Sequence, residues 1–114
     1  MARPRKRRRV CCIPERKVFG PLGVPIDKDN IILVTVEEYE VIRLIDLVGL
    51  TQEECASRMN VARTSIQRLY FDVRKKMAEA FINGKILKIE GGNYTECTGN
   101  NANCCDPSCA KRFL

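Results

Sequence analysis

The sequence predicts a mainly α-helical domain, a three-helix helix-turn-helix unit with a small β element and disordered tails. Two capping boxes, in which Glu38 follows Thr35 and Glu54 follows Thr51, predict two helix starts. Apolar residues at offsets of three and four follow each start, which is the period of a helix with one buried face. A chain of 114 residues holds one domain with tails and one modest core.

The first long helix is expected from Thr35 to Gly49, where glycine ends it. The second, shorter helix begins after Thr51 and places Cys55 on its apolar face. Because a free cysteine packs well as a small hydrophobe, Cys55 is predicted to be a core residue.

A turn and a long third helix complete the predicted motif. Asn60 tolerates the left-handed backbone of a turn, and Val61 can pack between the two flanking helices. The third helix begins near Ala62 and ends at Asn83-Gly84. The residues predicted to form its inward stripe are Ile66, Leu69, Tyr70, Val73 and Met77.

The opposite face of the third helix is polar and basic. Arginine and glutamine near a helix start can make bidentate contacts with guanine and adenine edges. Residues 35–60 carry six acids against two arginines, whereas residues 61–76 carry five basic residues against one acid. The alternative is that these charges form an ordinary solvated surface. However, the sign of the net charge reverses at the predicted turn between the two helices, and this coincidence favours nucleic-acid binding. The residues of this face and its flanks are Arg63, Thr64, Gln67, Arg68, Phe71, Arg74 and Lys75.

Residues 1–9 are predicted to form a flexible basic arm. They hold six positive charges, and without them the chain has 14 basic and 14 acidic residues. Such arms bind phosphates or enter a minor groove; a solubility tail is the alternative. The arginines assigned to this arm are Arg3, Arg5, Arg7, Arg8 and Arg9.

Two short runs are predicted to be strands. Ile31–Val34 is β-branched, and residues 85–90 alternate apolar and charged residues, so they are expected to pair as a small sheet beside the helices. The DNA-binding domain is therefore assigned to residues 10–94, and residues 95–114 to a flexible cysteine-rich tail.

The cysteine pattern leaves a metal site open. The chain has seven cysteines and no histidine. The absence of histidine excludes histidine-dependent triads and zinc sites that need imidazole. The odd number, with two adjacent pairs, argues against an extracellular disulfide framework and for a reducing, cytoplasmic location. No apolar run is long enough to span a membrane. One interpretation is a cysteine-rich tail that binds no fixed ligand. The other is a zinc or iron–sulfur site formed by Cys97, Cys104, Cys105 and Cys109, to which Cys11 or Cys12 could add a further ligand.

Several segments resemble a known family. The carrying segments are the Arg-Pro-Arg-Lys opening, Arg9-Val10-Cys11 with Pro14, Phe19-Gly20-Pro21, Thr35 to Gly49, Thr51-Gln52-Glu53-Glu54, Met59-Asn60-Val61-Ala62-Arg63, and Gly84-Lys85 to Gly91-Gly92. They are similar to uncharacterised protein family 0251, also called domain of unknown function 134. Its members are small prokaryotic proteins predicted to bind DNA through a fold like region 4 of bacterial sigma factors. The resemblance covers residues 1–94.

The resemblance implies a DNA-binding regulator. It implies that Thr51 and Gln52 touch phosphates, while the base-facing residues are Arg63, Thr64, Gln67 and Arg68. One departure is Ala62, because such motifs usually have serine as the cap of the recognition helix. An alanine there gives up a cap worth about 1 kcal/mol and a phosphate contact.

The expected function is that of a sequence-specific DNA-binding protein, a transcriptional regulator that reads the major groove with the helix from about residue 62. The alternative is a metal- or redox-responsive cysteine protein, a sensor or a deliverer of metal or clusters, whose helix-turn-helix docks a protein partner. The first expected partner is double-stranded DNA. A second copy of the chain is also expected, because one small unit buries little surface on DNA. RNA polymerase or another protein is a further candidate. No carboxylate pair, nucleophile–base set or phosphate-binding glycine loop suggests an enzyme.

Overall fold

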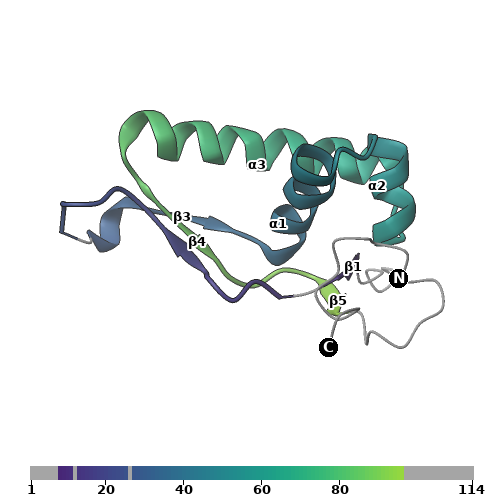
Figure 1. Ribbon diagram of the computed structural model, residues 1–114, viewed down its shortest axis with the longest axis horizontal. Coiled ribbons are helices and arrows are strands. Elements are labelled where there is room, and N and C mark those ends of the chain that lie inside the picture. Colours follow the sequence, from purple (N-terminus) through teal and green to yellow (C-terminus); the bar gives the residue numbers. More distant parts are fainter. Residues whose placement is uncertain (1–7, 12, 26, 97–114) are drawn as a thin grey trace, which may run out of the picture.

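The computed structural model describes residues 8–11, 13–25 and 27–96 (Figure 1). This part of the chain contains three α-helices and two small sheets. The helices are α1 (Val36–Ile42), which continues into a π-helical segment at Arg43–Val48, α2 (Gln52–Met59) and α3 (Arg63–Asn83). None of the described helices is both long and apolar enough to cross a bilayer.

Both predicted capping boxes are confirmed. At the start of α1, the Thr35 hydroxyl accepts a hydrogen bond from the Glu38 amide, and the Glu38 carboxylate accepts one from the Thr35 amide. Thr51 and Glu54 form the same reciprocal pair at the start of α2. Each box satisfies backbone donors that a helix start would otherwise leave unpaired.

The first helix has the predicted extent, but its second half is wider than expected. Residues Arg43–Val48 form π-helical turns, and Gly49 then ends the helix with φ 95°. That left-handed backbone favours glycine. In the π-helical segment Leu44 is buried, whereas Leu47 points out and is 79 % exposed.

The predicted pair of strands is confirmed as part of a three-stranded sheet. β3 (Ile31–Val34) pairs in parallel with β4 (Ile86–Ile89), so that Ile31 lies opposite Ile86. β2 (Val18–Phe19) joins the other edge of β4 in antiparallel orientation, and a 3-10 turn at Lys28–Asn30 precedes β3. Figure 1 shows this sheet running beside the C-terminal half of α3.

A second sheet joins the two ends of the described chain. β1 (Arg8–Val10) pairs in parallel with β5 (Tyr94–Glu96). The flexible arm predicted for residues 1–9 therefore differs from the structure at Arg8 and Arg9, which lie in a strand. The domain likewise extends beyond residue 94, since the tail predicted from residue 95 begins with two residues of β5.

A glycine turn brings β5 beside the start of α1. Gly92 has φ 114°, and a Cβ there would come within 2.5 Å of a Glu37 carboxylate oxygen. The Gly91 carbonyl accepts a hydrogen bond of 3.0 Å from the Val36 amide. Glycine is favoured at position 92 by this left-handed backbone and by the side chains of Glu37 and Thr35 beside it.

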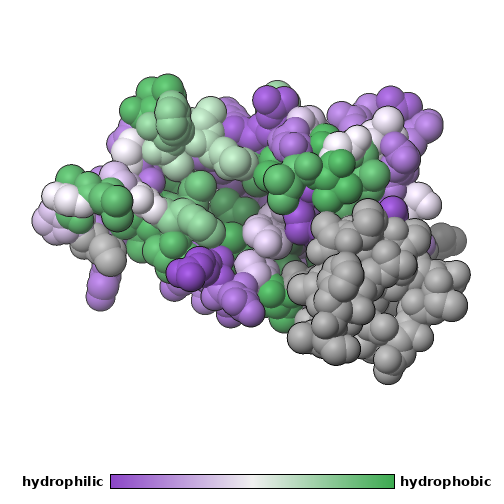
Figure 2. Space-filling view, in the orientation of Figure 1, coloured by the Kyte–Doolittle hydropathy of each residue, from purple (hydrophilic) through white to green (hydrophobic). Residues whose placement is uncertain are grey.

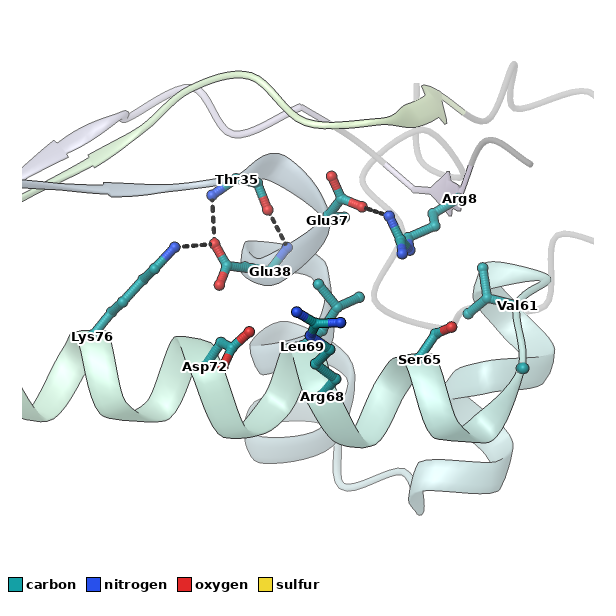
Figure 3. A pocket seen from close by; sticks show the side chains of 11 residues that line it. Arg8, Thr35, Glu37, Glu38, Val61, Ser65, Arg68, Leu69, Asp72 and Lys76 are labelled. Carbon is teal, nitrogen blue, oxygen red and sulfur yellow. Dashed lines mark hydrogen bonds and ion pairs between the residues drawn. The ribbon is translucent and has the colours of Figure 1, made fainter. Parts of the chain in front are cut away.

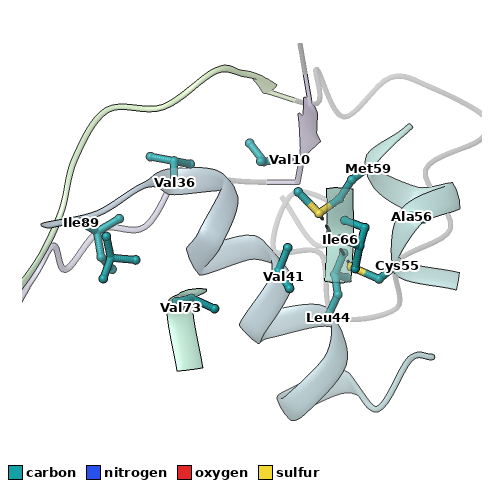
Figure 4. Close-up of a cluster of buried hydrophobic side chains, with 11 residues drawn as sticks. Val10, Val36, Val41, Leu44, Cys55, Ala56, Met59, Ile66, Val73 and Ile89 are labelled. Atoms are coloured by element: carbon teal, nitrogen blue, oxygen red, sulfur yellow. Dashed lines mark hydrogen bonds between the residues drawn. The ribbon is translucent and has the colours of Figure 1, made fainter. Parts of the chain in front are cut away.

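The core lies between α1, α2, α3 and the strands (Figure 4). Ile66 and Val73 of α3 point inward as predicted, and Cys55 is fully buried as predicted. Met77 was expected inward but is 40 % exposed. The buried cluster comprises Val10, Val34, Val36, Val41, Leu44, Cys55, Ala56, Met59, Ile66, Val73 and Ile89.

Candidate nucleic-acid interface

A tight turn connects α2 to α3. Asn60 adopts the left-handed conformation expected from the sequence, with φ 58° and ψ 48°. The Val61 amide then donates a 3.0 Å hydrogen bond to the Ala56 carbonyl, and the Val61 side chain packs against the core.

The start of α3 has no side-chain cap. Ala62 occupies the cap position, and no side chain bonds to the first amides of the helix. These amides carry the positive end of the helix dipole, so this helix end favours an anionic group.

The four residues predicted to face bases lie together on the first two turns of α3. Arg63, Thr64, Gln67 and Arg68 are all exposed. Arg63 has one weak charged contact, at 3.8 Å from Glu53 on α2. Between exposed groups such a contact contributes little, so it leaves the guanidinium available. Lys75 is also exposed, two turns further along the helix.

The two residues predicted to touch phosphates begin α2. The Thr51 hydroxyl oxygen accepts the Glu54 amide proton at 3.1 Å, which leaves the hydroxyl proton available to a phosphate. Gln52 is half-buried in the first turn. The pKa of Glu54 lies below its usual value, chiefly because its carboxylate accepts a hydrogen bond from the Thr51 amide.

A charged groove of about 640 Å³ lies between the start of α1, β1 and the flank of α3 (Figure 3). Arg8 and Lys76 face acids across it, and Arg68 extends along the same side of α3. The lining residues are Arg8, Thr35, Glu37, Glu38, Val61, Ala62, Ser65, Arg68, Leu69, Asp72 and Lys76.

Three acids of α1 are buried, which the sequence did not indicate. Glu37, Glu38 and Glu40 are each at most 3 % exposed. Each has a basic partner from elsewhere or from the next turn: Arg8 with Glu37, Lys76 with Glu38 at 2.7 Å, and Arg43 with Glu40 at 2.6 Å. Three of the six acids of residues 35–60 are therefore paired inside the molecule. Three acids near a helix start were a signal, but two of their partners, Arg8 and Lys76, are distant in sequence.

Arg8 and Arg9 hold β1 in place. Arg8 donates a hydrogen bond to the Glu37 carboxylate, and the Arg9 Nε donates one of 2.9 Å to the Arg58 carbonyl at the end of α2. The Cys11 amide donates to Glu40 at 2.6 Å. The two arginines predicted to contact DNA at this point are thus engaged with the protein itself. The other arginines of the predicted arm, Arg3, Arg5 and Arg7, lie outside the described residues.

The cysteines of the predicted metal site also lie outside the described residues: Cys97, Cys104, Cys105 and Cys109. In the described ranges no three histidine, cysteine, aspartate or glutamate side chains are grouped to hold a metal ion. Burial raises the pKa of the Cys55 thiol to about 12. A thiol with so high a pKa is a poor nucleophile and metal ligand, consistent with a packing role.

The chain belongs to a protein family that matches most of its length. The family, described as "Protein of unknown function DUF134", matches residues 1–97, which confirms the family that the sequence resembles. A UPF0251 protein of Desulfitobacterium hafniense is 55 % identical over 112 residues, covering 98 % of this chain and 89 % of that protein.

Further bacterial relatives match a shorter part of the chain. A UPF0251 protein of Halothermothrix orenii is 51 % identical over 94 residues, covering 82 % of this chain and 70 % of its own length. A UPF0251 protein of Caldanaerobacter subterraneus subsp. tengcongensis is 47 % identical over 94 residues, which cover 82 % of this chain and 80 % of that protein. No solved structure matches the chain significantly.

Proposed function

We propose that this protein is a sequence-specific DNA-binding protein whose α2, turn and α3 act as a helix-turn-helix. The observation that supports this most is the exposed group of Arg63, Thr64, Gln67 and Arg68 on the first two turns of α3. In helix-turn-helix proteins the N-terminal residues of the second helix contact base edges in the major groove. These side chains are donors and acceptors suited to guanine and adenine.

Phosphate contacts would position α3 in the groove. The uncapped amides at the start of α3 and the hydroxyl of Thr51 are available for them. A helix N-terminus attracts phosphate through its free amides and its dipole. Such contacts fix the register of the protein on the duplex but carry no base information.

The N-terminal arm would act beside α3. Arg8, the first residue that the structure describes, lines the same groove as Ala62 and Ser65 at the start of α3. In this position the arm can reach the backbone or minor groove next to the bases that α3 reads. A regulator of transcription with this arrangement could also engage RNA polymerase.

Fluorescence anisotropy with labelled duplex DNA tests the proposal. The test variant replaces Arg63, Gln67 and Arg68 with alanine. The control replaces three exposed polar or basic residues outside α3, Arg16, Lys17 and Asn30, with alanine and removes the same charge. We expect the test variant to lose at least about tenfold in affinity at moderate salt, and the control to lose little. Equal losses would refute the role of α3.

A metal- or redox-responsive function is the second candidate, and one observation favours it. Val10 and Glu96 are paired at the ends of β1 and β5, and Cys11 and Cys97 follow them directly in the sequence. The N-terminal cysteines and the tail thus start from neighbouring positions. We propose to measure zinc and iron in anaerobically purified full-length protein and in a chain ending at Glu96. Absence of stoichiometric metal from both, with unchanged folding and DNA affinity, would reject this candidate.

A further inference from the structure

The C-terminal half of α3 has an exposed face with apolar residues. Phe71 is 69 % and Ile82 is 74 % exposed, and Ala78 lies between them. Offsets of seven and four residues put these three side chains on one face of the helix. Figure 2 shows hydrophobic side chains gathered over the end of α3 that leads into β4.

This face exposes large apolar side chains next to one another. A phenylalanine buries about 200 Å² when covered, so Phe71, which is 69 % exposed, presents roughly 140 Å² on this face. Ile82, which is 74 % exposed, adds to this area, and the exposed Phe81 lies on the flank of the face. Exposed apolar patches of several hundred Å² on soluble proteins usually mark an interaction surface. A specific homodimer buries about 800 Å² per copy, of which about two thirds is apolar, so Phe71, Ala78 and Ile82 form the apolar centre of an interface that extends onto flanking residues such as Phe81.

The charges on this face are self-complementary. Lys75 and Glu79 lie on it, one turn apart, with Ala78 beside them. In an antiparallel pair of helices, a residue before the crossing point faces the residue equally far beyond it on the partner. If two α3 helices cross at the level of residue 77, Lys75 of one copy faces Glu79 of the other. The same geometry brings Phe71 near Ile82 of the partner copy, one residue short of the position directly opposite, and the small Ala78 next to the centre permits close approach.

We infer that this face of α3 binds a second copy of the chain, forming an antiparallel, two-fold symmetric α3–α3 dimer. A two-fold interface uses the same patch on both copies, so the patch must be complementary to itself. This face meets that requirement in both its apolar pairs and its charges. It begins one turn beyond Arg68 and includes Lys75, so in the dimer Lys75 pairs with Glu79 of the partner copy and is not one of the DNA contacts. The dimer does not depend on DNA binding and goes beyond the proposed function.

Charge reversal of one residue at a time tests the orientation of the pair. Lys75→Glu gives a face with two acids, and Glu79→Lys gives a face with two lysines. Each variant alone would repel its own copy, whereas a mixture of the two would restore both cross-pairs. Glu79→Lys also removes the exposed 2.9 Å pair with Lys85, so circular dichroism must confirm that both variants fold.

Sedimentation equilibrium of the full-length chain under reducing conditions supplies the measurement. We expect a dimer for the wild type, self-association weakened by more than about tenfold for each single variant, and dimers again in the equimolar mixture. Phe71→Glu should also give monomers, whereas Leu47→Glu, at an exposed leucine outside the face, should remain dimeric. A monomeric wild type, or dimers that none of these changes in α3 weakens, would overturn the inference. DNA affinity, measured separately, reports on the proposed function.

Discussion

Lys76 on α3 and Glu38 on α1 form an ion pair with 2.7 Å between Nζ and Oε1. The same carboxylate oxygen accepts the Thr35 amide proton at 2.9 Å (Figure 3). One buried glutamate therefore both caps α1 and attaches the middle of α3 to it. The pair fixes the position of the long helix that carries the proposed DNA contacts.

Lys76→Met should lower the free energy of unfolding by about 2–3 kcal/mol, because it leaves the buried Glu38 carboxylate without its charged partner. Urea denaturation followed by circular dichroism measures this change. The control is Lys28→Met, which removes an exposed lysine from the turn before β3 and should change stability by less than about 0.5 kcal/mol. Equal effects of the two substitutions would show that the ion pair contributes nothing.

Arg8 and Arg5 should behave differently on DNA, although both were first assigned to the basic arm. Arg8 is engaged with Glu37 inside the protein, so Arg8→Met should lower the melting temperature. For the Arg8→Met variant, the slope of log DNA affinity against log salt concentration should stay near that of the wild type. Arg5→Met should leave the melting temperature unchanged and reduce the slope by about one, as the loss of one phosphate contact does. A reduced slope for Arg8→Met as well would place Arg8 on DNA.

Cys55 should resist alkylation in the folded protein, because burial raises its thiol pKa to about 12 and only the thiolate reacts. Mass spectrometry after brief treatment with iodoacetamide at pH 8 should find Cys55 unmodified in buffer and modified in 6 M guanidinium. Cys55→Ser should cost about 1–3 kcal/mol of stability by burying a hydroxyl in the core. Rapid labelling of Cys55 under native conditions would contradict this assignment.

The cap of α2 should weaken in acid. The folded-state pKa of Glu54 is lowered by the Thr51 amide, so its contribution to stability is present above the ordinary glutamate pKa. That contribution is lost as the pH falls through the lowered pKa. Glu54→Gln should therefore destabilise the protein at pH 7, and the difference from the wild type should shrink toward pH 3. A difference independent of pH would exclude ionisation of Glu54 as the cause, and Glu15→Gln serves as the matched exposed control.

Local features of the fold were predictable because neighbouring residues determine them. The caps at Thr35 and Thr51, the turn at Asn60 and the strand at Ile31–Val34 follow from side-chain chemistry within a few residues. The pairing of β3 with β4 followed from two short runs that had no other partner. The exposed start of α3 followed from the helical period.

Features that depend on distant segments were not predictable. The pairing of Arg8–Val10 with Tyr94–Glu96 joins residues more than eighty positions apart, and neither run has a strong strand pattern. The burial of three α1 acids depends on basic partners such as Arg8 and Lys76. The same limitation led to the assignment of Arg8 and Arg9 to a flexible arm, since composition alone cannot distinguish a solvated arginine from a paired one.

The most direct test of the central claim is selection of bound fragments from a genomic DNA library at moderate salt. Wild type and the Arg63→Ala, Gln67→Ala, Arg68→Ala triple variant are compared. The account predicts that the wild type enriches a short sequence motif and that the triple variant does not, because base contacts from α3 give the sequence preference. Weak binding by both proteins, with no motif and a steep salt dependence, would contradict it and assign DNA binding to the arginine-rich N-terminus.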